Sequence, residues 1–264
     1  MNRIVIMGGT SGIGLHLAEA YASMGWKVGV AGRKEAPMKE LKEMFPQQVE
    51  WLKIDVTKSD APQRLLELIR NLGGMDVYLH TAGIGYENDS LDVGKDVATA
   101  ETNVVGYTRM VDTAYRFFRK ISEKGIGGHI AVISSVAGTK GIGKLASYSA
   151  SKKYQSTYLE ALEQLAHTEG VDLAFTDIRP GWVRTPLLED DRIYPMTMDE
   201  EKVVPLIIKA IKRRSRIAVV DWRWAVAVAF WRLIPGFLWV RIPLTISREA
   251  TPEQTEIDAE LANE

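Results

Sequence analysis

Short apolar runs alternate with longer amphipathic stretches along the chain. Several runs are apolar at almost every position, which is typical of strands buried on both faces of a sheet. The predicted strands are Arg3–Met7, Lys27–Ala31, Val49–Ile54, Asp76–Thr81, His129–Ser134, Leu173–Ile178 and Arg216–Val220. The predicted helices are Ile13–Met24, Pro37–Met44, Ala61–Leu72, Val93–Glu123, Tyr148–His167 and Asp199–Lys212. This order predicts an α/β fold, a doubly wound parallel sheet of seven strands with helices on both faces in a three-layer αβα arrangement.

The pattern shows no linker, repeat or low-complexity tract that would divide it. Residues 1–249 are therefore expected to form one domain, and the polar, acidic tail 250–264 is expected to lie outside it. The stretch 187–198 mixes apolar and acidic side chains after a Pro-Gly segment, so we expect a mobile lid over a substrate.

The stretch 222–244 is apolar apart from three arginines. Asp221 is expected to cap a helix that runs to about Ile234. A helix that is apolar on nearly all sides is usually buried, so we expect 222–244 to be buried within the fold or in an oligomer. Peripheral membrane contact is the alternative, because tryptophan with interspersed arginine suits a lipid interface.

Composition and charge remove several classes of function. The formal net charge is −1, which does not indicate a nucleic-acid partner. There are no cysteines, so disulfides and thiolate metal sites are excluded. The four histidines lack the spacing of metal ligands, so no metal is expected and each is interpreted as a surface or packing residue. The sequence shows no N-terminal targeting signal and no apolar run of ~20 residues, so a cytoplasmic protein is predicted.

The first predicted strand runs directly into a glycine-rich turn that precedes a helix. Glycines there let the backbone approach a pyrophosphate, and the helix N-terminus offers unpaired N–H groups and a partial positive charge. The turn predicts a dinucleotide site made by Gly8, Thr10, Ser11, Gly12, Ile13 and Gly14.

The end of the second predicted strand bears on which dinucleotide binds. Folds that bind NAD carry an acid there for the ribose 2′-hydroxyl, whereas this chain has Arg33. A guanidinium can hold a 2′-phosphate through a charge-assisted fork, so NADP(H) is favoured over NAD(H). The alternative is that Arg33 is a solvated loop residue.

Tyr148 and Lys152 stand four residues apart on a predicted helix and therefore share one face. A tyrosine has a pKa near ~10, and a neighbouring ammonium lowers it toward a value useful for proton transfer at neutral pH. Ser135 follows the fifth predicted strand, at the edge where open parallel sheets bind ligands. Its hydroxyl can donate to a substrate oxygen beside Tyr148.

The glycine turn, Ser135, Tyr148 and Lys152 together resemble the short-chain dehydrogenases/reductases of the common, shorter type, from about Arg3 to Val220. The resemblance implies a Rossmann fold, and an oxidoreductase that interconverts a ketone or aldehyde and an alcohol by hydride transfer, with Tyr148 as general acid/base. It implies that Asn103 helps hold a water in a proton relay with Lys152. It adds cofactor contacts at Asp55, Val56, Ala82, Gly83, Tyr148, Lys152, Pro180, Gly181, Val183 and Thr185.

Two positions depart from the family pattern. Met7 replaces the usual threonine before the glycines, and His80-Thr81 replaces a pair of asparagines. All four expected catalytic residues are present, which argues against a non-catalytic NADP-sensing or scaffold protein on the same fold. The partners expected are a small carbonyl or alcohol substrate, either apolar and lipid-like or a small polar 3-oxo compound, and further copies of the chain in a homodimer or homotetramer.

Overall fold

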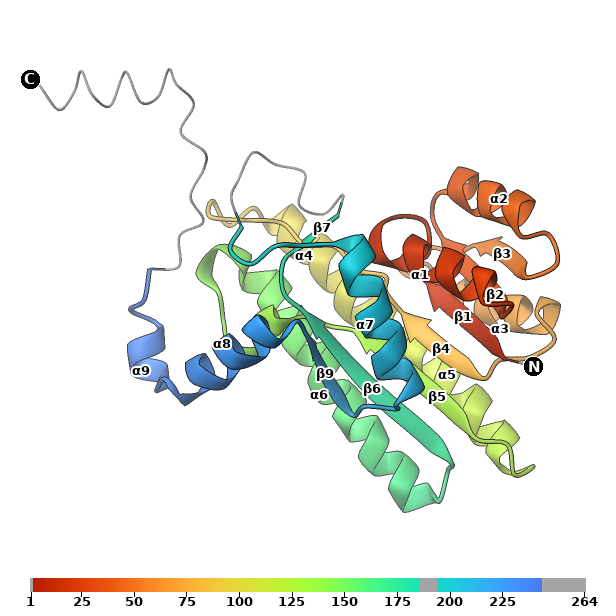
Figure 1. The fold of residues 1–264 in the computed structure, drawn as a ribbon. Helices are drawn as coiled ribbons and strands as arrows, with labels where there is room; N and C mark the ends of the chain where they lie inside the picture. The colour runs from red at the N-terminus through yellow and green to blue at the C-terminus, as the bar shows by residue number, and fades with distance from the viewer. Residues whose placement is uncertain (1, 186–193, 244–264) are drawn as a thin grey trace, which may run out of the picture.

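A seven-stranded parallel sheet forms the centre of the computed structural model, which describes residues 2–185 and 194–243. Its strand order is β3-β2-β1-β4-β5-β6-β9, and each neighbouring pair is parallel (Figure 1). The strands are β1 (Arg3–Met7), β2 (Lys27–Gly32), β3 (Val49–Lys53), β4 (Val77–His80), β5 (Gly128–Ile133), β6 (Leu173–Pro180) and β9 (Ile217–Val220). The predicted doubly wound sheet of seven strands is confirmed.

Helices cover both faces of the sheet because successive strand residues point to opposite sides. In β1, Val5 and Met7 belong to one buried apolar cluster, whereas Ile4 and Ile6 belong to the other. The first cluster is completed by α3 (Ala61–Asn71), α5 (Tyr107–Ser122) and α6 (Ala146–Glu169). The second is completed by α1 (Gly12–Ser23), α2 (Glu35–Met44) and α7 (Glu200–Lys212).

The predicted helix over Val93–Glu123 is unbroken to Ser122, but it contains a π-helical turn that the pattern does not predict. The structure has α4 (Val93–Ala100), a π-helical turn at Glu101–Gly106, and then α5. At Gly106 a Cβ would lie 2.7 Å from Cγ2 of Val56, so the chain passes too close to its neighbour for a side chain. A π turn adds one residue without changing the apolar period much, which is why the pattern does not reveal it.

The predicted lid at 187–198 is described from Tyr194 onward, and residues 187–193 lie outside the described part. Its last residue is not in a loop, because β8 (Met198–Asp199) pairs in parallel with β7 (Val183–Arg184). This pairing holds the segment after β6 against the start of α7. The predicted tail 250–264 lies outside the described residues.

The apolar C-terminal stretch forms α8 (Trp222–Leu233) and α9 (Gly236–Trp239). Asp221 caps α8, as predicted, by accepting a hydrogen bond from the backbone N–H of Arg223 at 2.9 Å. Within the described chain only one side of this helix is buried, since Trp224 and Val228 are buried but Phe230 is exposed, so an oligomer or membrane contact for the other side stays a prediction. The cause is that one face of α8 packs on the protein.

Two further properties concern residues 2–185 and 194–243. None of the helices there is both long and apolar enough to cross a membrane. No group of three or more histidines, aspartates or glutamates is arranged there to hold a metal ion.

Candidate active site

A cleft of about 870 Å³ lies where the strands of the sheet end. The sheet order changes direction between β1 and β4, and open α/β sheets bind ligands at such a switch point. The predicted site residues that line this one cleft are Gly8, Thr10, Ser11, Gly12, Ile13, Gly14, Arg33, Asp55, Val56, Ala82, Gly83, Ser135, Tyr148, Lys152, Pro180, Gly181, Val183 and Thr185. Asn103 is the exception, because it is fully buried and does not line the cleft.

The glycine turn after β1 forms a close-fitting floor at one end of the cleft. Gly8 has a φ of +98°, and a Cβ there would lie 2.5 Å from the backbone nitrogen of Ala82. Within the described part of the chain, α1 has no side-chain cap and no acidic residue in its first turn. Its first N–H groups are therefore available to an anionic group, which fits the pyrophosphate of a dinucleotide.

The carboxyl group of Glu200 also lies close to this turn, near Gly12. Burial raises the pKa of Glu200, which disfavours its carboxylate, and the nearby His16 opposes that effect. Nδ1 of His16 lies 2.5 Å from Oε2 of Glu200. Because burial disfavours the carboxylate form of Glu200, this residue places less negative charge beside the phosphate-binding floor.

The other end of the cleft is basic. Arg33 and Lys34 both line it and are exposed, directly after β2. Asp55 lies nearby, and its Oδ1 accepts hydrogen bonds from the N–H and the hydroxyl of Thr57 at 3.0 and 2.8 Å. Burial alone would raise the pKa of Asp55, but these bonds and the charge of Arg33 bring it below its usual value. Asp55 is thus a fixed carboxylate whose charge Arg33 partly balances.

Ser135 and Tyr148 meet in the middle of the cleft. Ser135 follows β5 and accepts a hydrogen bond from the backbone N–H of Ala137 at 3.1 Å. Its hydroxyl also bonds the phenol of Tyr148, an interaction that lowers the pKa of Tyr148. The tyrosine ring packs on Gly85, where a Cβ would lie 2.5 Å from Cδ2 of the ring. The two hydroxyls therefore face one point in the cleft from two different elements.

Lys152 does not lower the pKa of Tyr148 in this arrangement, contrary to the prediction. Burial raises the pKa of Tyr148, and the bond from Ser135 only partly opposes it. The Nζ atom of Lys152 lies 5.7 Å from the centre of the tyrosine ring. Burial also lowers the pKa of Lys152 to about 8, against the opposing charge of Asp177. The reason is that both side chains lie deep in the cleft, where burial disfavours the charged form of each.

Comparison with known proteins places this cleft in a family. The family described as short chain dehydrogenase matches residues 2–193, well over half of the chain. The chain belongs to the short-chain dehydrogenases. An uncharacterized oxidoreductase of Mycobacterium tuberculosis is 31% identical over 244 residues, covering 88% of this chain and 94% of the relative.

Two further proteins are similar to this short-chain dehydrogenase. A farnesol dehydrogenase of Aedes aegypti is 30% identical over 199 residues, covering 72% of this chain and 80% of that one. The crystal structure of a 3-ketoacyl-(acyl-carrier-protein) reductase from Brucella melitensis complexed with NADH matches with a TM-score of 0.73. It is 20% identical and covers 83% of this chain and 95% of that chain, so the likeness shows the fold alone.

The side chain of Asn103 is fixed by hydrogen bonds in this short-chain dehydrogenase, and its part in a proton relay stays a prediction. Its side chain accepts from the N–H of Ile84 at 2.9 Å and donates to the carbonyl oxygen of Ile84 at 2.7 Å. It also donates to the hydroxyl of Ser151 at 3.0 Å. These bonds tie the loop after β4 to α6, so the side chain of Asn103 positions the cleft wall.

Gln155 connects Asn103 with Lys152 and was missed in the sequence. Its Oε1 accepts from Nζ of Lys152 at 3.1 Å, and its Nε2 donates to the backbone oxygen of Asn103 at 2.9 Å. Lys152 also donates to the carbonyl oxygen of Ile133 at 3.0 Å. The available signal is that Gln155 stands three residues after Lys152, on the same helix face.

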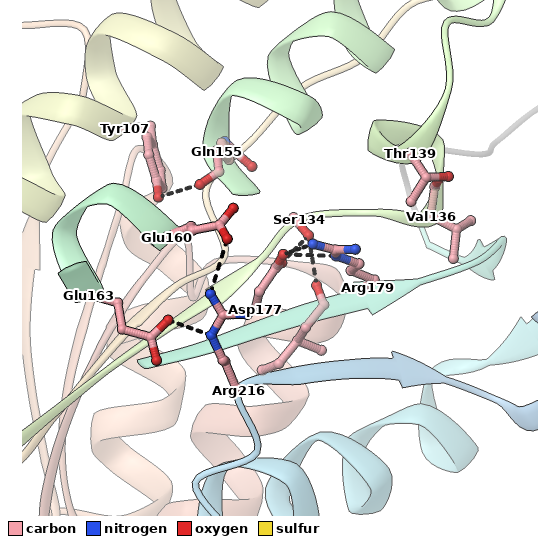
Figure 2. A network of polar contacts seen from close by, with 11 residues as sticks. Tyr107, Ser134, Val136, Thr139, Gln155, Glu160, Glu163, Asp177, Arg179 and Arg216 are labelled. Carbon is pink, nitrogen blue, oxygen red and sulfur yellow. Dashed lines mark hydrogen bonds and ion pairs between the residues drawn. The ribbon is translucent and has the colours of Figure 1, made fainter. Parts of the chain in front are cut away.

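A buried carboxylate, that of Asp177, acts on the charge of Lys152. Asp177 on β6 accepts a hydrogen bond from the hydroxyl of Ser134 and pairs with Arg179, whose Nη2 lies 2.6 Å from Oδ2 of the aspartate (Figure 2). The charge of Asp177 favours the protonated form of Lys152. The carboxylate of Asp177 therefore limits how far burial lowers the pKa of Lys152.

Three tryptophans form the wall of the cleft beyond Tyr148. Trp182, Trp224 and Trp231 all line it. The ring of Trp182 lies 4.6 Å from that of Tyr194, and a Cβ on Gly181 would collide with the ring of Trp224. Sequence reasoning placed Trp224 and Trp231 on one helix stripe but did not place them in the cleft. The wall presents an apolar surface to whatever lies beside Tyr148.

Proposed function

We propose that the chain is an NADP(H)-dependent oxidoreductase that interconverts a ketone or aldehyde and the corresponding alcohol. The observation that carries this proposal is the meeting of the Ser135 and Tyr148 hydroxyls in the cleft that also contains the glycine turn. A substrate oxygen held between these hydroxyls would lie beside the part of the cleft that suits a nicotinamide.

The residues of the chain have separate tasks in this proposal. When bound, the nicotinamide supplies hydride in reduction and accepts it in oxidation. Tyr148 gives its phenolic proton to the oxygen of the carbonyl as it is reduced, and takes that proton back in oxidation. The Ser135 hydroxyl accepts from the N–H of Ala137 and donates over a long 3.4 Å to the carbonyl oxygen of Pro180, and it would turn this proton to the substrate oxygen. Lys152, which lines the cleft beside Tyr148, would bind the ribose of the nicotinamide.

The reaction is tested by following NADPH absorbance with a panel of ketones and aldehydes. The unmodified protein should turn over at least one class of carbonyl. Tyr148→Phe should lower the single-turnover rate by about 10²-fold or more and leave the affinity for NADPH nearly unchanged. Retention of more than roughly a tenth of the rate would contradict the role of general acid.

The preference for NADP(H) rests on the basic end of the cleft. Arg33 and Lys34 line it, and a guanidinium can bind a 2′-phosphate through two parallel hydrogen bonds. The similar reductase from Brucella melitensis is complexed with NADH, so the fold alone does not exclude NAD(H). The side chains that follow β2 would therefore decide between NADP(H) and NAD(H).

This preference is tested by measuring the dissociation constants of NADPH and NADH. Arg33→Asp should weaken NADPH binding strongly and NADH binding little, because it removes the fork and adds a repulsive charge. Arg70→Asp, at an exposed position on α3, is the matched control and should change neither constant. Equal affinities of the unmodified protein for both cofactors would exclude the proposed preference.

For the substrate we propose an apolar, lipid-like carbonyl or alcohol. The support is the wall of Trp182, Trp224 and Trp231 beside the reacting hydroxyls. The similarity to a farnesol dehydrogenase is in keeping with this class. In a series of aldehydes and 2-alkanones, kcat/KM should rise with chain length, by up to about tenfold for each pair of buried methylenes. A preference for small polar 3-oxo compounds would instead favour the alternative class.

A further inference from the structure

The C-terminal helices carry a large apolar surface on the side that faces away from the sheet. In Figure 1, α8 and α9 project from one end of the molecule, far from α2 and α3. We define the outer face as the exposed apolar residues Trp222, Val226, Phe230, Leu233, Phe237, Leu238, Val240 and Ile242. The exposed fractions of Phe230 and Leu233 are 70% and 78%. Contiguous apolar surfaces of this kind mark interaction sites.

The opposite face of the same helices is fixed to the protein. Nε1 of Trp231 donates to the hydroxyl of Thr139 at 2.8 Å, and Nε1 of Trp239 donates to the carbonyl oxygen of Gly141 at 2.7 Å. The ammonium of Lys140 donates to the carbonyl oxygen of Ile234 at 2.8 Å. The outer face is therefore held in place as a surface, and among the described residues it is solvent-facing.

The charges on this segment discriminate between the partners that could cover it. The stretch 222–243 contains Arg223, Arg232 and Arg241 and no aspartate or glutamate. Arg223 is paired with Asp221, while Arg232 and Arg241 are exposed. A two-fold dimer through the outer face would bring like charges of the two copies together with no carboxylate of the segment to balance them. An anionic surface would complement them.

From these observations we infer that the outer face docks on the surface of a bilayer that contains anionic phospholipid. The aromatic and aliphatic side chains enter the boundary between headgroups and acyl chains. Arg232 and Arg241, which have no ion pair within residues 2–185 and 194–243, bind phosphate groups. Tryptophan side chains are enriched in the headgroup region of a bilayer, and arginine side chains keep their charged groups there. The helices lie on the membrane and do not cross it.

The same helix connects this surface with the cleft. Trp224, Ala227 and Trp231 of α8 line the cleft, whereas Val226 and Phe230 belong to the outer face. A docked enzyme would therefore hold its apolar wall close to the lipid, where an apolar substrate is concentrated. This consequence rests on the proposed substrate class, but docking itself does not.

Docking is tested by co-sedimentation of the full chain with vesicles, without substrate or cofactor. One set of vesicles contains phosphatidylcholine and phosphatidylglycerol, and the other contains phosphatidylcholine alone. The protein should pellet with the first set and much less with the second, and added salt should release it. Replacing both Arg232 and Arg241 by glutamine should weaken the partition about 25-fold, at roughly fivefold for each charge. Phe230→Ser combined with Leu233→Ser should abolish pelleting.

A matched control removes an apolar side chain that is exposed elsewhere. Met44→Ser, at the end of α2, changes a residue with an exposed fraction of 58% and should leave pelleting unchanged. Circular dichroism of each variant establishes that it is folded. Turnover of a water-soluble carbonyl is measured separately, so that loss of docking and loss of the proposed reaction are told apart.

Three outcomes would overturn the inference. The first is a folded protein that does not pellet with anionic vesicles. The second is a dimer, seen by light scattering without vesicles, that Phe230→Ser and Leu233→Ser convert to a monomer, because the outer face would then be covered by a second copy. Pelleting that is equal on both kinds of vesicle would likewise remove the role assigned to the arginines.

Discussion

Replacing Gln155 with methionine tests whether this buried amide helps Lys152 keep its charge. The substitution retains much of the side-chain volume but removes both hydrogen bonds of the amide. One is the acceptor for Nζ of Lys152 at 3.1 Å, and the other is the donor to the backbone oxygen of Asn103 at 2.9 Å. Gln155 is fully buried, so water does not readily replace either partner.

The expected loss of stability depends on pH. A hydrogen bond to a charged group contributes about 1.5–3 kcal/mol and one between neutral groups about 1 kcal/mol. Below pH 8 the ammonium of Lys152 is present, so the variant should lose about 2.5–4 kcal/mol of unfolding free energy. Near pH 10 the buried lysine is neutral, and the loss should fall to about 2 kcal/mol.

The sign follows from proton linkage. The pKa of Lys152 is about 8 in the folded chain, against a usual value of 10.5. Between these values the unfolded chain binds the proton that the folded chain has released, so this lysine makes stability rise with pH. Loss of the Gln155 acceptor lowers the folded pKa further, so in the variant the rise should begin at a lower pH.

The assay is urea denaturation of both proteins at several pH values from 7 to 10, together with the pH profile of kcat. In the variant, the limb of that profile that reports loss of the lysine charge should move toward lower pH. Tyr107→Phe is the matched control, because it removes the hydrogen bond from the phenol to the backbone oxygen of Gln155 and leaves the amide in place (Figure 2). Its cost, about 1 kcal/mol, should not vary with pH. A cost of Gln155→Met that is equal at pH 7 and pH 10 would refute the reasoning and make Gln155 a packing residue.

Two further substitutions test the site and its surroundings. Gly85→Ala should lower kcat about tenfold or more, because a Cβ would lie 2.5 Å from the ring of Tyr148 and displace the proton donor. The control is Gly143→Ala, which adds a Cβ in open space and should leave kcat unchanged. Equal kcat values for the two variants would contradict the packing of Tyr148 on Gly85. Burial, with a smaller effect of the lysine charge, lowers the pKa of His80 to about 3. Stability should therefore fall as pH drops from 6.5 toward 3, by about 1 kcal/mol per pH unit for this residue. His80→Asn should flatten that fall in denaturation curves, and an unchanged slope would show that His80 does not cause it.

The sequence predicts the features of this molecule that arise from local patterns. The apolar run of β1 and the glycines that follow it are adjacent in the chain, so their order alone predicts a strand, a turn and a helix N-terminus. Tyr148 and Lys152 share a helix face for the same reason. Boundaries differ from the predictions by one to two residues at most strands, since fraying and caps decide where pairing stops.

Contacts between distant segments could not be predicted in this way. The amide of Gln155 meets the backbone of Asn103 across 52 positions, and the ring of Trp239 bonds Gly141 across 98. The pKa of Tyr148 could not be predicted from the local sequence for the same reason. The spacing of Tyr148 and Lys152 predicts a lowered tyrosine pKa, but the structure gives a raised one, because desolvation depends on everything packed around the pair.

The C-terminal helix shows why an apolar pattern alone does not decide burial. In α8 apolar residues occur around nearly the whole circumference, so its sequence has no polar stripe that would orient it. The rest of the chain supplies the orientation, because Thr139 and the cleft take the side that carries Trp224 and Trp231. The remaining side is left exposed among the described residues, and the arginines of the segment favour an anionic lipid surface as its partner in the docking that we infer.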